Sequence, residues 1–211
     1  MPSSLVRANP APIGVVLAGG RGARMGGSKL TVRLQGRPLI EFPLRALRAV
    51  LSDVAVIAKP DVQLPPLAGV MVWIEPAEPR HPLVGIVEAL ALAEDRPVMV
   101  CAADLPLVTP ALVERIVQAG SPAPAAIASC REQIQPLLGC YQPAAADLLR
   151  PAARRASEPV RRVVASIDPV HVEVADPNEL FNVNSPEDLL VAGGLLDRAR
   201  PRSRPHSPPS C

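Results

Sequence analysis

The sequence predicts a three-layer α/β domain in which helices cover both faces of a mostly parallel central sheet. Short apolar runs of strand length alternate with segments of helical spacing, which is the pattern of parallel strands joined by helical crossovers. Hydrophobic residues make up 48% of the 211 residues, enough for a globular core. We expect residues 13–198 to form this domain and residues 1–12 and 199–211 to be flexible termini.

The first strands and the first helix lie in the N-terminal part of the chain. Residues 13–18 form an apolar run that ends at a glycine pair, which predicts a buried strand. Residues 39–51 have helical spacing. The β-branched runs at 54–58 and 70–74 predict two further strands.

The middle of the chain carries the most regular signals. Residues 83–93 have the composition of a helix, and 97–103 form the most strand-like run of the sequence. Residues 109–119 predict a helix with Thr109 as N-cap and Pro110 at the first helical position.

Beyond residue 120 the periodicity is weaker. It indicates strands at 125–129, 137–141 and 170–174 and helices at 144–153, 160–165 and 185–196. The last helix has a distinct start, because Ser185 can cap it and Asp188 stands three residues later, as in a capping box.

Composition argues against several classes of protein. The aromatic residues are few and scattered, so a base-stacking platform for nucleic acid is not expected: they are Phe42, Trp73, Tyr141 and Phe181. A net charge of +2 does not indicate a nucleic-acid partner either. The cysteines lack zinc-site spacing, and Cys101 is expected to be a buried free thiol. The sequence contains no signal peptide and no apolar run of about 18 residues, so we expect a cytoplasmic protein without a membrane partner.

Glycines and cations are concentrated in the loop after the first predicted strand. Residues 17–30 contain five glycines, whose backbone N–H groups can form a concavity that binds anions. Arg21, Arg24 and Lys29 add positive charge for the β- and γ-phosphates of an NTP. The glycine spacing fits neither the dinucleotide fingerprint nor a P-loop. A solvated surface loop is the alternative, but the buried strand before it favours phosphate binding.

Asp104 directly follows the strand predicted at 97–103. A carboxylate at the end of a parallel strand, beside a phosphate loop, is suited to hold Mg²⁺, which takes one or two carboxylates together with phosphate oxygens and water. An aspartate that satisfies the backbone of its own turn is the alternative at this position. The neighbouring phosphate loop favours the metal.

Two asparagines precede the last predicted helix. Asn182 and Asn184 alternate, so their side chains share one face if the segment is extended. Either could complete a magnesium shell or bind the acceptor substrate. The alternative is that the segment serves only as a helix start.

The motif from Leu17 to Leu30, followed by Gly36-Arg37-Pro38-Leu39, resembles the LAGGxxxRMG…K…GxPL signature of the molybdenum cofactor guanylyltransferase family. Residues 181–189 resemble its closing NVNTPEDL motif, and 81–85 resemble its GPLAG segment near the guanine pocket. The resemblance implies a Rossmann-like, glycosyltransferase-A-like nucleotidyltransferase fold. It also implies GTP and a molybdopterin-type acceptor as substrates, Mg²⁺ as cofactor, and partners in molybdoenzyme maturation.

The family's functional residues carry over to matching positions. The resemblance assigns catalysis to Arg21, Lys29 and Asp104, and metal binding to Asp104. It assigns contact with the acceptor, or with the metal as a second ligand, to Asn182 and Asn184. The residues to which it assigns nucleotide binding are Leu17, Ala18, Gly19, Gly20, Arg21, Arg24, Lys29, Lys59, Pro82 and Gly85. Two positions depart from the pattern: Glu75-Pro76 stands where the family often has Asp, and Lys59 lies where it has an Asn-containing strand.

Three other functions stay open from the sequence. The chain could be a cytidylyltransferase acting on the same pterin, or a sugar- or polyol-phosphate nucleotidyltransferase. It could also be a non-catalytic protein that binds and delivers the pterin cofactor. Asp104 and Lys29 argue against the last of these, and the Gly19-Gly20 pair favours guanylyl over cytidylyl transfer.

Overall fold

A computed structural model describes residues 10–19, 31–120 and 122–199. Over these residues the chain folds around a seven-stranded sheet with the strand order β5-β4-β1-β6-β8-β7-β9. The strands are β1 (Ile13–Leu17), β4 (Val54–Ala58), β5 (Met71–Ile74), β6 (Val98–Ala102), β7 (Ala125–Cys130), β8 (Gln133–Tyr141) and β9 (Val170–Glu173). Only β8 pairs antiparallel with its neighbours in this sheet. The mostly parallel α/β fold is therefore confirmed.

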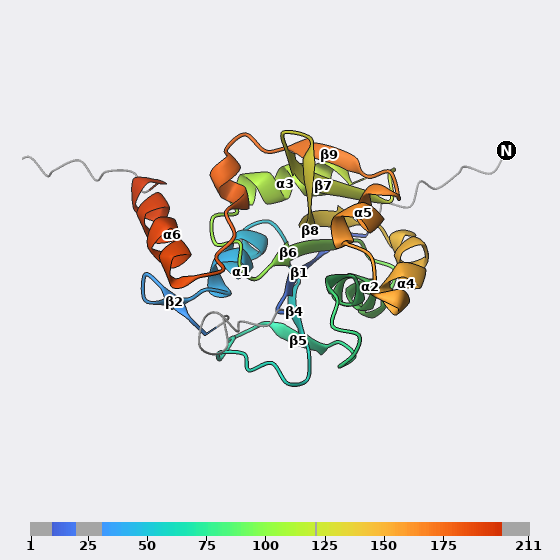
Figure 1. The fold of residues 1–211 in the computed structure, drawn as a ribbon, viewed down its shortest axis with the longest axis horizontal. Coiled ribbons are helices and arrows are strands. Elements are labelled where there is room, and N and C mark those ends of the chain that lie inside the picture. The colour runs from blue at the N-terminus through green and yellow to red at the C-terminus, as the bar shows by residue number, and fades with distance from the viewer. Residues whose placement is uncertain (1–9, 20–30, 121, 200–211) are drawn as a thin grey trace, which may run out of the picture.

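Helices cover both faces of the sheet (Figure 1). The α-helices of the described residues are α1 (Glu41–Arg48), α2 (Pro82–Leu92), α3 (Pro110–Ala119), α4 (Ala145–Arg155), α5 (Val160–Ala165) and α6 (Pro186–Ala199). α1 and α3 lie on one face, while α2, α4 and α5 lie on the other. No helix among the described residues is long and apolar enough to cross a bilayer.

Strand β1 divides the interior into two cores. Its residues are all buried, and alternate side chains point to opposite faces: Val16 packs with α1 and α3, whereas Val15 and Leu17 pack with α2 and α4. This burial on both faces explains why β1 is a continuous apolar run rather than an alternating one. Cys101 lies in the first of these cores as a free thiol, as expected.

Elements with local start signals match their predictions most closely. Strand β4 has the predicted bounds. Thr109 caps α3 by accepting a 3.2 Å hydrogen bond from the Leu112 N–H, and Pro110 is the first helical residue. The predicted capping box of α6 also forms, since Ser185 and Asp188 exchange hydrogen bonds between side chain and backbone.

Three features were not predicted. β8 begins at Gln133 rather than at residue 137 and joins β7 through an irregular register. A short antiparallel pair, β2 (Arg33–Leu34) and β3 (Arg37–Pro38), precedes α1. A 3-10 helix, Pro177–Leu180, follows β9.

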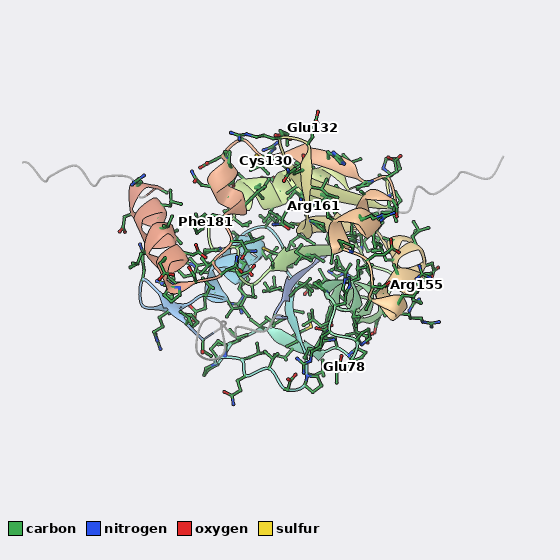
Figure 2. The ribbon with its side chains drawn as sticks, in the orientation of Figure 1. Glu78, Cys130, Glu132, Arg155, Arg161 and Phe181 are labelled. Atoms are coloured by element: carbon green, nitrogen blue, oxygen red, sulfur yellow. The ribbon has the colours of Figure 1, made fainter. Side chains whose placement is uncertain are left out.

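α6 stands apart from the main layers, beside the β2–β3 pair (Figure 1). It shares a small third core with residues from that pair and from the segment before α6: Leu34, Leu39, Val183 and Ala192 are its buried members. Phe181, labelled beside α6 in Figure 2, packs against this cluster. Gln35 adds polar links to the Gly193 carbonyl, at 3.2 Å, and to the Asp197 carboxylate, at 2.8 Å.

Candidate active site

A cavity of about 470 Å³ opens at the carboxyl ends of four parallel strands. β1 continues into β4 on one side through α1, whereas β5 continues through α2 to β6 on the other side of β1. The chain therefore reverses direction at β1, and ligands of open α/β sheets bind at such a reversal, beyond the carboxyl ends of the strands. The cavity is lined by Leu17, Gly19, Lys59, Glu75, Glu78, Arg80, His81, Pro82, Gly85, Ala102, Ala103, Asp104 and Leu137.

Lys59 and Glu75 form a buried ion pair in the wall of this cavity. Each is the first residue after its strand, β4 or β5, and these strands pair in parallel with Ala58 opposite Ile74. Lys59 Nζ lies 3.2 Å from Glu75 Oε2, and both side chains are 6% exposed. Burial raises the pKa of the Glu75 carboxyl above its ordinary value, and the charge of Lys59 only partly offsets this shift.

The Lys59 ammonium is also held by the backbone of the loop after β5. It donates hydrogen bonds to the carbonyl oxygens of Pro76, at 2.6 Å, and Pro79, at 3.0 Å. An ammonium has three N–H donors. Among the described residues, two carbonyls and the Glu75 carboxylate therefore lie around the Lys59 ammonium.

Two glycines border the Glu75 carboxylate. A Cβ atom built on Gly19 would lie 3.7 Å from Oε1, and one built on Gly85 would lie 3.3 Å from Oε2 and from Leu17 Cδ2. The second distance is tighter than ordinary van der Waals contact. Glycine at position 85 therefore leaves the room in which Glu75 lies beside α2.

The N-terminus of α2 forms another wall of the cavity. His81 is the N-cap: its Nδ1 accepts from the Leu83 N–H at 3.4 Å, and its Nε2 lies 3.0 Å from the Glu158 carbonyl. Since a carbonyl oxygen only accepts, Nε2 carries the proton and Nδ1 is free to cap. Arg80 pairs with Asp61 at 2.6 Å and with Glu78 at 3.3 Å; Figure 2 labels Glu78 after β5.

Asp104 lines the cavity from the end of β6, where the sequence predicted a metal carboxylate. Its Oδ1 atom is buried. The backbone N–H of Val183 donates a 3.0 Å hydrogen bond to the Asp104 carbonyl oxygen. The segment that contains both asparagines is thus attached directly to the Asp104 turn.

The two asparagines lie in different environments. Asn182 Oδ1 is buried and accepts no hydrogen bond from any part of the chain that the structure describes. Asn184 is exposed, and its side-chain nitrogen lies 3.5 Å from the Asn182 carbonyl. Neither residue belongs to the lining of the cavity. Of the two asparagines, Asn182 is therefore the one whose side-chain oxygen lacks a hydrogen-bond partner among the described residues.

The oxygens around Asp104 suit Mg²⁺. Mg²⁺ binds through one or two carboxylates, with phosphate oxygens and water completing its shell. Within residues 10–19, 31–120 and 122–199 no three His, Cys, Asp or Glu side chains cluster as a metal site. A protein ligand set of the Asp104 carboxylate and the Asn182 amide oxygen fits these requirements.

The structure brings together many of the residues that the sequence singled out, but not all. Leu17, Gly19, Lys59, Pro82, Gly85 and Asp104 line one cavity. Ala18 does not: its side chain lies in the core with α1, and its N–H donates to the Ile57 carbonyl. Gly20, Arg21, Arg24 and Lys29 lie outside the described residues.

Sequence reasoning missed several wall residues. Leu137 comes from β8, whose position beside β6 has no local sequence signal. Arg80 and Glu78 lie in a loop without a recognisable motif. Glu75 stood out only together with Pro76, as a departure from a family pattern, although its place after β5 matches that of Lys59 after β4.

Comparison with known proteins shows the family to which this chain belongs. The model of the MobA-like NTP transferase domain matches residues 14–172. The chain belongs to this family. As a member of the MobA-like NTP transferase domain family it is a nucleotidyltransferase, and the matched residues include the carboxyl end of every strand that borders the cavity.

Individual relatives agree with this assignment. The chain is 34% identical over 187 residues to the molybdenum cofactor guanylyltransferase of Pseudomonas syringae pv. syringae (strain B728a), covering 84% of this chain and 92% of that protein. The structure of molybdopterin-guanine dinucleotide biosynthesis protein A from Archaeoglobus fulgidus has the same fold: the TM-score is 0.74 at 24% identity, over 88% of this chain and 99% of that chain.

An enzyme named for the transfer of a different nucleotide has a similar fold. The structure of 2-C-methyl-D-erythritol 4-phosphate cytidylyltransferase from Thermus thermophilus has a TM-score of 0.65 at 19% identity, over 87% of this chain and 98% of that chain. Fold alone therefore does not select the base. The residues of the cavity must do so.

Proposed function

We propose that this chain is a cytoplasmic, Mg²⁺-dependent enzyme that transfers GMP from GTP to the phosphate of a molybdopterin-type acceptor and releases pyrophosphate. The relatives' names supply the reaction. The observation that carries it to this chain is the cavity in which Asp104 and the Glu75–Lys59 pair lie together at the strand ends, next to Gly19.

The proposed reaction needs no general base. An acceptor phosphate oxygen, already anionic, attacks the α-phosphorus of GTP; a new P–O bond forms while the bond from the α-phosphorus to the bridging oxygen breaks. The electron pair of that bond leaves with pyrophosphate. Catalysis in such a transfer consists mainly of positioning and of neutralising charge.

We assign the parts of the nucleotide as follows. The triphosphate lies along the segment that continues from Gly19, where Gly20, Arg21, Arg24 and Lys29 bind it and offset the charge of the leaving group. The base lies against Leu17, Pro82 and Gly85, with Lys59 in the wall behind it.

The metal belongs beside these phosphates. Bound Mg²⁺ would offset charge on the phosphate oxygens. Asp104 would hold it, and the Asn182 amide oxygen, buried without a hydrogen-bond partner among the described residues, is the second candidate ligand. Asn184, exposed beside it, is the candidate contact to the acceptor.

The decisive experiment supplies the purified chain with Mg²⁺, the molybdopterin acceptor and each of GTP, CTP, ATP and UTP. Formation of the guanine dinucleotide of the pterin, with one pyrophosphate released per product and a loss of both in EDTA, is the expected result. Preferred use of CTP would make the chain a cytidylyltransferase. Turnover with a sugar or polyol phosphate, but not with the pterin, would indicate the third reaction class. Binding of pterin without any transfer would indicate a delivery protein.

A further inference from the structure

Both ring nitrogens of His81 are engaged by the protein itself. Nδ1 accepts a 3.4 Å hydrogen bond from the Leu83 N–H, and protonated Nε2 donates a 3.0 Å hydrogen bond to the Glu158 carbonyl. His81 nevertheless belongs to the lining of the cavity. Since its two nitrogens already have partners, the imidazole is not placed to accept a proton from a substrate. What it gives the site is the fixed position of the residues that it bonds.

The hydrogen bond to Glu158 joins two elements that are far apart in the sequence. Glu158 lies in the turn between α4 and α5, 77 positions from His81. α2 and α4 pack together on the same face of the sheet. Because His81 is the N-cap of α2, its bond fixes the start of this helix, where Pro82 and Gly85 line the cavity, to the turn that follows α4.

The loop between β5 and α2 is held from its other side by Lys59. The Lys59 ammonium donates hydrogen bonds to the Pro76 and Pro79 carbonyls. The Pro79 carbonyl also accepts from the backbone N–H of His81, at 3.0 Å. This part of the cavity wall is thus fastened to the end of β4 by Lys59 and to the α4–α5 turn by His81. The attachment through His81 is the one at the start of α2.

The sequence makes this attachment a feature of the present chain. His81 stands at the first position of the segment that resembles GPLAG, where that pattern has glycine. A glycine has no side chain, so it can neither donate to the Glu158 carbonyl nor accept from Leu83 as His81 does. The two side-chain bonds therefore belong to this chain and not to the pattern that it resembles.

We propose that His81 is a positioning residue for the nucleotide: through the Glu158 carbonyl it fixes the start of α2 as the wall against which the base lies. The inference rests on the proposed nucleotidyl transfer and adds a residue to it. The wall meets the base equally before and during the chemical step, so its position sets the binding of GTP rather than the rate of that step. Loss of the bond to Glu158 should therefore raise the KM for GTP and leave kcat near the wild-type value.

Two substitutions separate the two hydrogen bonds of the imidazole. The side-chain oxygen of Asn reaches about as far from the backbone as Nδ1 and caps helices well, but the side chain is too short to reach Glu158. The amide nitrogen of Gln reaches about as far as Nε2, and Gln is not among the residues that cap helices well. His81→Asn thus keeps the cap and loses the bond to Glu158, whereas His81→Gln keeps that bond and loses the cap.

Steady-state turnover of the purified chain with Mg²⁺ and the molybdopterin acceptor gives kcat and the KM for GTP, and inhibition by inorganic pyrophosphate gives the affinity for phosphates alone. His81→Asn should raise the KM for GTP about fivefold, as expected for the loss of one hydrogen bond. Its kcat and its pyrophosphate inhibition constant should stay within about twofold of the wild type, because the phosphates lie elsewhere in the site. His81→Gln should keep the KM within about twofold of the wild type, although the lost cap lowers its melting temperature by about 2–4 °C.

His171→Asn is the matched control. It makes the same substitution at an exposed histidine in β9, at the opposite edge of the sheet from β5. The KM for GTP of this variant should equal that of the wild type. A KM that rises in His81→Asn, but in neither His81→Gln nor His171→Asn, assigns the effect to the bond between His81 and Glu158.

Several results would overturn the proposal. An unchanged KM in His81→Asn would show that the wall keeps its position without the bond to Glu158. Equal increases of KM in His81→Asn and His81→Gln, or changes of KM that follow the melting temperature, would show that His81 acts only through stability. A pyrophosphate inhibition constant that rises by the same factor as the KM would indicate a general loosening of the site. A wild-type chain that transfers no nucleotide would overturn the proposed function and this inference together, whereas the other results, with an active wild type, overturn the inference alone.

Discussion

The backbone N–H of Val183 donates a 3.0 Å hydrogen bond to the carbonyl oxygen of Asp104. These residues are far apart in sequence, and their contact joins the end of β6 to the segment before α6. Asn182, whose side-chain oxygen is buried, precedes Val183 in the chain, so this hydrogen bond holds the segment of Asn182 at the Asp104 turn.

Replacing Asp104 by Ala should abolish transfer without unfolding the protein. The carboxylate is the proposed protein ligand of Mg²⁺, and loss of such a ligand costs several kcal/mol of transition-state stabilisation, or at least about a hundredfold in kcat. Turnover is measured at saturating GTP and Mg²⁺, and the thermal transition verifies the fold. A folded Asp104→Ala protein with wild-type turnover would falsify the metal assignment.

Asn182→Ala should raise the Mg²⁺ concentration needed for half-maximal activity, because it removes the candidate second ligand. Its thermal stability should change little, since the Asn182 Oδ1 atom has no hydrogen-bond partner among the described residues and its removal breaks no hydrogen bond with them. Magnesium titration of turnover is the measurement.

Asn184→Ala is the matched control for this change, because the exposed Asn184 lies two residues away in the same segment. It should leave the magnesium dependence as in the wild type and should raise the KM for the acceptor. The opposite pattern, in which only Asn184→Ala alters the magnesium dependence, would exchange the roles of the two asparagines.

Gly85→Ala should weaken GTP binding by about tenfold, because the new side chain crowds the cavity wall against which the base is proposed to lie. The new methyl group would lie 3.3 Å from Glu75 Oε2 and from Leu17 Cδ2, so the carboxylate must shift. The gain in helix propensity, up to about 1 kcal/mol, offsets the crowding, and we expect a small change in stability. Calorimetric titration measures the affinity.

Gly194→Ala separates helix propensity from crowding. Gly194 lies within α6, and a Cβ atom there would meet nothing within 4 Å. The free energy of unfolding should rise by about 0.5–1 kcal/mol with unchanged GTP affinity. Equal GTP affinities in Gly85→Ala and the wild type would show that the base does not lie against Gly85.

The raised pKa of Glu75 predicts a pH dependence of stability. The folded protein holds this proton more tightly than the unfolded chain does, so the stabilising contribution is complete below the ordinary value of 4.5 and is lost as the pH rises through the folded pKa. The free energy of unfolding of the wild type, minus that of Glu75→Gln, should therefore increase as the pH falls from neutral towards 4.5.

Urea denaturation at a series of pH values measures this difference, in which the other titrating groups cancel. Glu78→Gln serves as the control, since its side chain is 72% exposed and the change should alter stability by less than about 0.5 kcal/mol. A wild-type advantage over Glu75→Gln that grows as the pH rises would contradict the cause assigned to the pKa of Glu75.

The predictions from sequence succeeded where a signal is local. Thr109 and Pro110 determine the start of α3 by themselves, and the apolar run of β4 is visible without knowledge of its neighbours. Strand order is not local, so the insertion of antiparallel β8 next to β6 could not be predicted. The polar residues Gln133 and Gln135 also concealed the first half of β8.

The candidate site also contains residues that a local signal predicts and residues whose contacts depend on the order of the strands. Asp104 stands at the end of a strand that its own composition identifies, and the structure places it in the cavity. The partnership of Lys59 with Glu75 depends on β4 and β5 being neighbours with Ala58 opposite Ile74. That register is a property of the sheet, so the sequence showed both residues without showing the pair.

The small core under α6 connects two stretches from opposite ends of the chain. Leu34 and Leu39 come soon after the glycine-rich segment, whereas Val183 lies beside Asp104. With so few buried members, this cluster should open more readily than the main sheet, and both stretches should open together as one cooperative unit. Hydrogen exchange would then show similar, intermediate protection for the amides of Leu39 and Val183, so that substitutions in α6 would alter magnesium and nucleotide binding at the same time.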